Sequence, residues 1–151
     1  MNKIKQFLYK IYKLSWKITQ PQTIGVRAIL IKNNKILLVK HTYSDQWFLP
    51  GGGLKKGEKL ENAIKRELNE ELGVEVNETQ LHGVYQNFYE GKRDYIIVFK
   101  TENFEISPKK DQEIEQYEFF DFLNIPEKTS PGTRKRIKEL LENKMAYHGD
   151  W

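Results

Sequence analysis

Three glutamates in residues 60–72 are spaced so that they would share one face of an α-helix. The segment reads LENAIKRELNEEL, and Glu67, Glu70 and Glu71 stand at positions i, i+3 and i+4. Carboxylates at these spacings are neighbours on a helix and repel one another. A divalent cation bound between them would relieve the repulsion, so the spacing indicates a metal site.

An apolar stripe on the same expected helix shows where the glutamates point. At about 100° per residue, four residues recur on one side: Leu60, Ile64, Leu68 and Leu72. Glu71 falls inside this stripe and Glu67 at its edge, whereas the acids of a solvated helix would face away from it. We therefore expect a partly buried acidic site. Glu61 lies in the first turn, where the helix dipole favours acids, and it is given no catalytic role.

Three consecutive glycines, residues 51–53, follow the hydrophobic sequence WFLP shortly before this helix. Glycine adopts positive φ and lets the backbone approach a ligand closely. The glycines do not form a P-loop, because Glu58-Lys59 stands where Lys-Ser/Thr is needed, and they lack the GxGxxG spacing of a dinucleotide site.

The sequence from Gly52 to Val74 resembles the Nudix box at every fixed position of that motif. It runs Gly52, five residues, Glu58, seven residues, Arg66-Glu67-Leu68, one residue, Glu70-Glu71, one residue, Gly73-Val74. A looser similarity to Nudix hydrolases extends from Gly25 to the C-terminal helix. The resemblance implies an α/β fold, an α/β/α sandwich with a mixed β-sheet. It also implies Mg²⁺- or Mn²⁺-dependent cleavage of a nucleoside diphosphate linked to another group.

The resemblance further implies the roles of individual residues. Glu70 and Glu71 would be the principal metal ligands, and Glu67 either a further ligand or the general base that activates water. The backbone carbonyl of Gly51 would be another metal ligand. Hard oxygen donors of this kind suit Mg²⁺ or Mn²⁺.

Arg66 and Glu58 are expected to support the metal site by their position. An arginine fork binds a carboxylate bidentately and would join the loop before the helix to the helix itself. We count Arg66 with the catalytic set for this reason. The alternative is an ordinary exposed ion pair worth under about 1 kcal/mol.

A further metal ligand is expected outside the box, in residues 111–121 (DQEIEQYEFFD). Related chains place a metal-binding acid ahead of the aromatic residue that matches Phe119, which indicates Glu113. Glu115 is an equal alternative, because alternation along a strand would put both side chains on the same side.

Substrate choice depends on residues outside the box, for which the sequence offers candidates without a motif. Aromatic side chains can stack on a base, and arginine can bind phosphate. The candidates are Arg27, His41, Tyr43, Tyr85 and Arg93. An ordinary surface histidine is the alternative for His41, and a hairpin charge pair with Asp94 is the alternative for Arg93.

Composition fits one compact enzyme domain. The chain has 151 residues, of which 38% are hydrophobic and 13% aromatic, enough to fill a single core. It has no cysteine, which excludes disulfides and thiolate metal sites. No apolar run reaches the length of a membrane span, and we expect a cytoplasmic protein.

The net charge of +4 comes from one end of the chain. Residues 1–20 hold five lysines and no acid, or +5, so the remainder has 20 basic and 21 acidic residues, or −1. A nucleic-acid groove would need basic charge clustered on the domain itself. We therefore expect a small-molecule substrate and no nucleic-acid partner.

Residues 1–20 also carry apolar side chains at helical spacing, which predicts a basic amphipathic helix ahead of a Nudix domain at residues 21–151. We prefer a helix that packs on its own domain or on the partner in a homodimer. A weak contact with a membrane surface and a flexible basic arm are the alternatives.

Strand and turn patterns predict the remaining elements. Two hairpins are expected, residues 23–31 with 36–41 across Asn33-Asn34, and 81–89 with 95–101 across residues 90–92. A short strand would end at Asp121, followed by a turn at 122–125. A final helix would run from Pro131 to about Lys144.

The leading hypothesis is Mg²⁺-dependent hydrolysis of a phosphoanhydride bond in a small nucleoside diphosphate derivative. A nucleotide sugar, ADP-ribose and a (d)NTP are the substrates considered. Within this class, the alternative is an RNA 5′-pyrophosphohydrolase. From another class, the alternative is a non-catalytic nucleotide-sensing Nudix module, but such modules typically lose box glutamates that this chain retains.

Overall fold

The computed structural model describes residues 22–89, 92–109, 112–144 and 148–151. The helix predicted over residues 1–20 lies outside these described residues. No helix in the described part of the chain is long and apolar enough to cross a membrane.

Seven of the described strands form one mixed sheet in the order β3-β2-β1-β6-β5-β9, with β8 paired to β2. They are β1 (Gln22–Lys32), β2 (Lys35–His41), β3 (Trp47–Phe48), β5 (Gln80–Tyr89), β6 (Lys92–Thr101), β8 (Ile114–Asp121) and β9 (His148–Asp150). The pairs β1/β6 and β5/β9 are parallel, and the others are antiparallel. A separate two-stranded sheet joins β4 (Val74–Val76) to β7 (Phe104–Ile106).

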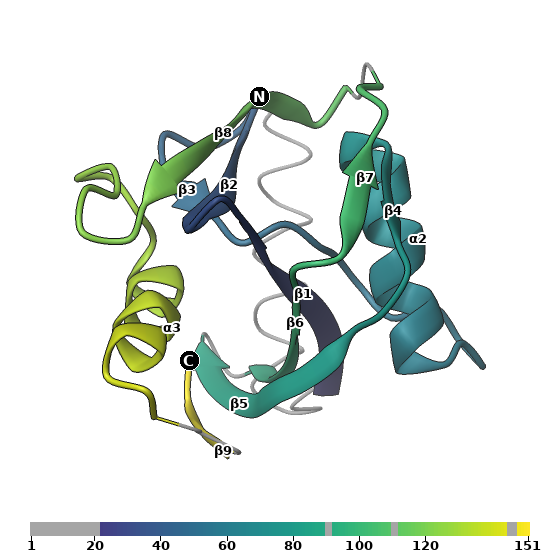
Figure 1. Ribbon diagram of the computed structural model, residues 1–151. Helices are drawn as coiled ribbons and strands as arrows, with labels where there is room; N and C mark the ends of the chain where they lie inside the picture. Colours follow the sequence, from purple (N-terminus) through teal and green to yellow (C-terminus); the bar gives the residue numbers. More distant parts are fainter. Residues whose placement is uncertain (1–21, 90–91, 110–111, 145–147) are drawn as a thin grey trace, which may run out of the picture.

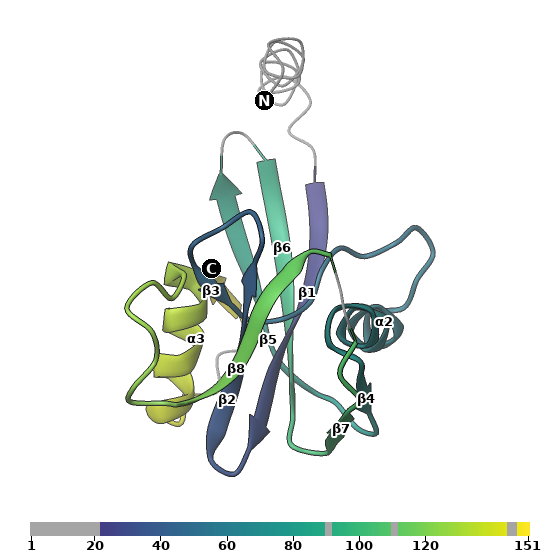
Figure 2. The same cartoon turned by 90° about the horizontal axis from the view of Figure 1, so that it is seen from above.

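Two helices cover opposite faces of the main sheet, α2 (Leu60–Leu72) and α3 (Pro131–Leu141) (Figures 1 and 2). Side chains alternate along β1, so Val26 and Ala28 pack in the core under α2 and Ile29 in the core under α3. This arrangement confirms the predicted α/β/α sandwich with a mixed sheet.

Local chemistry explains the elements that the sequence predicted. The β1–β2 hairpin turns at Asn33 and Asn34, with φ of 52° and 58°, values that a two-residue type I′ turn requires and that asparagine tolerates. Helix α3 begins at Pro131 behind the Ser130 cap. It ends at Leu141, earlier than expected, because Asn143 takes a left-handed φ of 50°.

Helix α2 ends at Gly73, whose φ of 65° places it in the left-handed region. A Cβ there would lie 1.9 Å from the Ser107 carbonyl oxygen, so the position requires glycine. The buried side of the helix differs from the expected stripe at its start. Leu60 is 37% exposed, and burial begins at Ala63 and Ile64, after the first turn.

Candidate active site

The glycine loop is held beside β1 by backbone hydrogen bonds. The amide of Val26 donates to the Gly52 carbonyl oxygen at 2.9 Å, and the amide of Ala28 donates to that of Pro50 at 2.9 Å. The carbonyls of Pro50 and Gly52 therefore point towards β1.

Gly51 joins this loop to the box helix. Its amide donates to Glu71 Oε2 at 2.9 Å, and the Glu71 side chain is buried. Gly51 has φ of +129°, and a Cβ would lie 2.3 Å from the Val26 carbonyl oxygen. Only glycine fits this position. The hydrogen bond from the Gly51 amide holds the loop next to the Glu71 carboxylate.

Gly52 lies directly against the carboxylate of Glu67. A Cβ at Gly52 would come within 2.5 Å of that carboxylate, whereas a Cβ at Gly53 would meet nothing within 4 Å. The Glu67 side chain is only 15% exposed. The missing side chain at Gly52 thus leaves the space that Glu67 fills.

Arg66 binds three acids and the loop at once. Its Nε and Nη2 donate to the two oxygens of Glu58 at 2.8 and 2.9 Å, and Nη2 also donates to the Gly53 carbonyl at 3.0 Å. Its Nη1 donates to Glu67 Oε1 at 2.7 Å and to Glu70 Oε2 at 3.0 Å. The hydrogen bond from Arg66 is the main reason that the pKa of Glu58 falls to about 2, and that from Glu58 is the main reason that the pKa of Arg66 rises.

Arg27 lies on β1 beside the box acids. Its Nη1 donates to the Val26 carbonyl at 2.9 Å. Burial lowers the pKa of the guanidinium, and the nearby charges of Glu71 and Glu67 act in the opposite direction. Arginine stays protonated even so, which gives the site a positive group next to its glutamates.

These groups line one cavity of about 640 Å³, here called the box cleft. Its lining residues are Arg27, His41, Tyr43, Gly51, Gly52, Gly53, Lys55, Arg66, Glu67, Glu70, Glu71, Gln112 and Glu113. The His41 and Tyr43 rings stack at 4.9 Å with 12° between their planes. Most residues predicted for the site therefore share one cleft.

Lys55 and Gln112 line the box cleft without having been predicted. Lys55 Nζ lies 3.6 Å from Glu70 Oε1. Lys55 occupies one of the variable positions between Gly52 and Glu58, so the motif gave no signal for it. Gln112 precedes Glu113 in a loop whose course depends on the pairing of β8.

A bulge in β8 separates the two candidates for the outer metal ligand. Lys40 pairs with Gln116 and His41 with Ile114, so one extra residue lies between them on β8. Glu113 lines the box cleft, whereas Glu115 forms an ion pair with Lys40 at 3.0 Å. The strict alternation assumed from the sequence does not hold here, and the structure places Glu113 near the box.

Two candidate substrate residues, Tyr85 and Arg93, lie outside the box cleft. Tyr85 faces α3 from β5, fully buried, with its hydroxyl donating to Glu139 Oε2 at 3.0 Å and the Arg136 guanidinium 3.5 Å from the ring centroid. Burial raises the pKa of its hydroxyl. Arg93 is exposed near the start of β6, opposite Phe88 of β5.

A second cleft of about 730 Å³ adjoins the box cleft and shares Arg27, Gly52 and Gly53 with it. It is completed by Thr23, Gly25, Gln46, Phe48, Leu49, Asn87, Asp94, Ile96, Ser130, Pro131, Gly132, Thr133 and Trp151. No sequence motif pointed to this second cleft, because its residues come from six separate stretches of chain.

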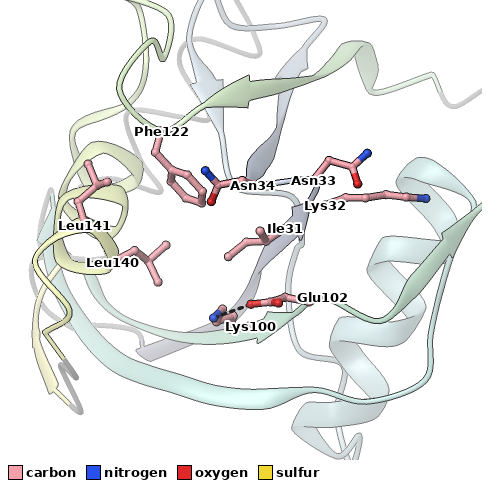
Figure 3. Close-up of a pocket in the computed structure, with 9 residues that line it drawn as sticks. All are labelled: Ile31, Lys32, Asn33, Asn34, Lys100, Glu102, Phe122, Leu140 and Leu141. Carbon is pink, nitrogen blue, oxygen red and sulfur yellow. Dashed lines mark ion pairs between the residues drawn. The ribbon is translucent and has the colours of Figure 1, made fainter.

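A third cavity, of about 550 Å³, lies at the β1–β2 turn and is drawn in Figure 3. Its apolar wall consists of Ile31, Phe122, Leu140 and Leu141, and Lys100 and Glu102 form an ion pair across 2.8 Å. It contains no residue of the box, so it is not the candidate active site.

The residues of the box cleft fit a divalent cation by their donor chemistry. Within the described residues, no three ligand side chains form a ready-made cation cluster, since Glu67 and Glu70 face Arg66 while Glu71 faces the Gly51 amide. Glu67, Glu70, Glu71 and Glu113 nevertheless present carboxylates to one cleft. Such oxygen donors suit a hard divalent cation.

Comparison with known proteins agrees with this fold and site. The NUDIX domain family model matches residues 21–141. An ADP-ribose pyrophosphatase from Methanocaldococcus jannaschii is 34% identical over 123 residues, 78% of this chain and 72% of that protein. The m7GpppN-mRNA hydrolase of Saccharomyces cerevisiae is 30% identical over 164 residues, 95% of this chain but 17% of that protein. A MutT NUDIX hydrolase from Burkholderia pseudomallei has 25% identity and a TM-score of 0.72, covering 79% of this chain and 98% of that one.

A mixed sheet between two helices, with the box helix facing a glycine loop, defines the Nudix fold, and the chain belongs to the Nudix family. Its activity is that of a Nudix-type pyrophosphohydrolase. Nudix hydrolases in general use a divalent metal.

Proposed function

We propose that this chain catalyses Mg²⁺- or Mn²⁺-dependent hydrolysis of a phosphoanhydride bond in a nucleoside diphosphate linked to another group. The observation that carries the proposal is the shared cleft of Glu67, Glu70, Glu71 and the Gly51 backbone, with Arg27 beside them. A nucleotide sugar, ADP-ribose and a (d)NTP are the substrates of this class. The similarity to the M. jannaschii ADP-ribose pyrophosphatase makes ADP-ribose the first to test.

Charge explains why the cleft would need a cation to bind this substrate. Two like unit charges 4 Å apart repel by about 4 kcal/mol at an effective dielectric constant near 20, and four carboxylates line the cleft. When bound, a divalent cation offsets this repulsion, polarises a phosphoryl oxygen and orients the attacking water. Glu70, Glu71, the Gly51 carbonyl and Glu113 would hold it.

The remaining residues would divide the chemical work. Water attacks one phosphorus, the anhydride oxygen leaves with the other phosphate, and the water proton passes to a carboxylate, for which Glu67 is the candidate unless it binds the metal. Arg27 would bind a diphosphate oxygen. Arg66 and Glu58 position the helix and the loop.

The proposal extends to the partners and the location of the enzyme. The near-neutral charge of residues 21–151 supports a small-molecule substrate over nucleic acid, and a cytoplasmic location accords with such a substrate. The similarity to the yeast m7GpppN-mRNA hydrolase supports a test of an RNA 5′ end as the second candidate. For residues 1–20, we propose packing on the domain or on a second copy, with a weak membrane-surface contact as the alternative.

A substrate panel tests the proposal directly. ADP-ribose, UDP-glucose, dGTP and a 5′-triphosphorylated RNA oligonucleotide are each incubated with the protein in Mg²⁺, Mn²⁺ or EDTA, and the nucleotide or phosphate product is measured. We expect turnover of a small nucleoside diphosphate derivative with a metal and none with EDTA. If neither metal supports turnover of any diphosphate compound, the proposal is wrong.

A further inference from the structure

Strand β9 brings Trp151 into the second cleft. The strand runs parallel to β5, pairing Gly149 with Tyr85 and Asp150 with Gln86. The Trp151 amide then donates to the Gln86 carbonyl oxygen at 2.8 Å. The position of the indole in the second cleft is therefore set by strand pairing.

Helix α3 has room for the indole because residue 132 is glycine. A Cβ at Gly132 would lie 2.2 Å from Trp151 Nε1. On another side, the Tyr85 ring meets the indole at a centroid distance of 6.0 Å, with 62° between the planes. Lys135 Nζ donates to the Trp151 carbonyl oxygen at 3.0 Å. These contacts leave Trp151 half-buried, with part of it lining the second cleft.

Polar groups line the second cleft together with the indole. Asn87 of β5 and Asp94 of β6 are register partners, so their side chains lie side by side on the same face of the sheet. An amide and a carboxylate offer both donors and acceptors. An aromatic surface with such groups nearby suits a planar, hydrogen-bonding ring.

The two clefts adjoin, with Arg27, Gly52 and Gly53 in the walls of both. A molecule with its diphosphate in the box cleft would reach past these residues towards Trp151. We propose that the second cleft binds the heterocyclic base of the substrate and that Trp151 is the residue on which the base stacks. This inference rests on the proposed function, which places the diphosphate in the box cleft.

The position of Trp151 in the chain sets this feature apart from the shared fold. The family match ends at residue 141, so β9 and Trp151 lie beyond it. A base contact from this segment would belong to this chain rather than to the common Nudix scaffold.

Comparing nucleoside diphosphates with inorganic pyrophosphate separates the binding of the base from the binding of the diphosphate. The dissociation constants of ADP, GDP, UDP and CDP are compared with that of inorganic pyrophosphate in Mg²⁺, for the full chain and three variants. We expect at least one nucleoside diphosphate to bind more tightly than pyrophosphate. Trp151→Leu should lose about 10-fold of that advantage, the scale of one base stacked on an aromatic side chain, with pyrophosphate affinity unchanged. Trp151→Phe should keep most of the advantage.

Trp47→Leu is the matched control, because Trp47 packs against Phe120 and does not line the second cleft. A second measurement avoids dependence on the folding of the Leu variant. In the doubly substituted chain Trp16→Phe, Trp47→Phe, Trp151 is the remaining tryptophan, and its emission, excited at a wavelength that tyrosine does not absorb, should change with the nucleoside diphosphate but not with pyrophosphate.

The outcomes distinguish the inference from the proposed function. An unchanged base advantage in Trp151→Leu, or Trp151 emission that does not respond to a bound nucleotide, overturns the inference alone. Pyrophosphate binding without any advantage for a nucleoside also overturns it alone. If neither pyrophosphate nor any nucleoside diphosphate binds the native chain, the proposed function fails as well.

Discussion

Arg66 binds both carboxylate oxygens of Glu58, with Nε 2.8 Å from Oε1 and Nη2 2.9 Å from Oε2. The Arg66 side chain is only 19% exposed and the Glu58 side chain only 14%. The pair joins the loop before α2 to the middle of the helix. Since the same guanidinium reaches Glu67 and Glu70, it also orients two of the three box acids.

This pair should make stability depend on pH. The pKa of Glu58 is held at about 2, below the ordinary 4.5, first by the hydrogen bond from Arg66. The folded state therefore keeps Glu58 ionised at pH values where the unfolded chain takes up a proton. The stabilisation is present above about pH 4.5 and is lost as the pH falls towards 2.

We expect the thermal unfolding midpoint of Glu58→Gln to fall less steeply than that of the native chain across this pH range, as measured by circular dichroism. Glu61→Gln, at an exposed position in the first turn of α2, is the control and should follow the native curve. Parallel curves for the native chain and Glu58→Gln would contradict this role of the pair.

Glu71→Gln should lower kcat by at least about 100-fold, the size typical of losing one electrostatic group at a reacting centre. The glutamine oxygen can still accept the bond from the Gly51 amide, so the fold should be kept. Steady-state kinetics on the substrate found in the panel measure the loss, and the unfolding midpoint checks the fold. Near-native kcat would mean that the metal site lies elsewhere.

Gly52→Ala should reduce kcat/KM by about 10- to 100-fold, the usual scale for disturbing a group that supports a metal site. Its Cβ would come within 2.5 Å of the Glu67 carboxylate and displace it. Gly53→Ala is a close control, because a Cβ there meets nothing within 4 Å, and it should keep near-native kcat/KM. Equal effects of the two substitutions would show that Glu67 is not positioned through Gly52.

Glu113→Gln should weaken Mn²⁺ binding by about 10-fold or more, because Glu113 lines the box cleft with the box glutamates. Glu115→Gln removes the same charge two residues away, where the side chain pairs with Lys40, and should leave Mn²⁺ affinity unchanged. Electron paramagnetic resonance of free Mn²⁺ measures both constants. A larger loss for Glu115→Gln would reverse the assignment.

Residues 1–20 can be tested by co-sedimentation with anionic lipid vesicles. We expect the full chain and a chain that starts at Gln20 to pellet equally, because we prefer packing of this segment within the protein or against a second copy. The five lysines of this segment would favour anionic lipid if the segment bound as an interfacial helix, so these vesicles test the membrane alternative under favourable conditions. Greater pelleting of the full chain, reversed by salt, would instead support the membrane contact.

The sequence alone determined the features that depend on local rules. The spacing of Glu67, Glu70 and Glu71 predicted a shared helical face, and in the structure all three line the box cleft. The asparagine pair and Pro131 predicted a hairpin turn and a helix start, and both are confirmed. Turns, caps and helix periodicity involve neighbours within a few residues, so the sequence contains the information directly.

Long-range pairing decided the rest. The bulge in β8 placed Glu113 in the box cleft and Glu115 on Lys40, and a bulge depends on the register between two strands. Tyr85 lies in the core under α3. Its burial depends on how the helix packs on the sheet, which the local sequence does not determine. The three-residue strand β9 is too short for a pattern of its own, yet its pairing with β5 puts Trp151 in the second cleft. Local sequence sets which side chains share a face, and tertiary packing sets which faces meet.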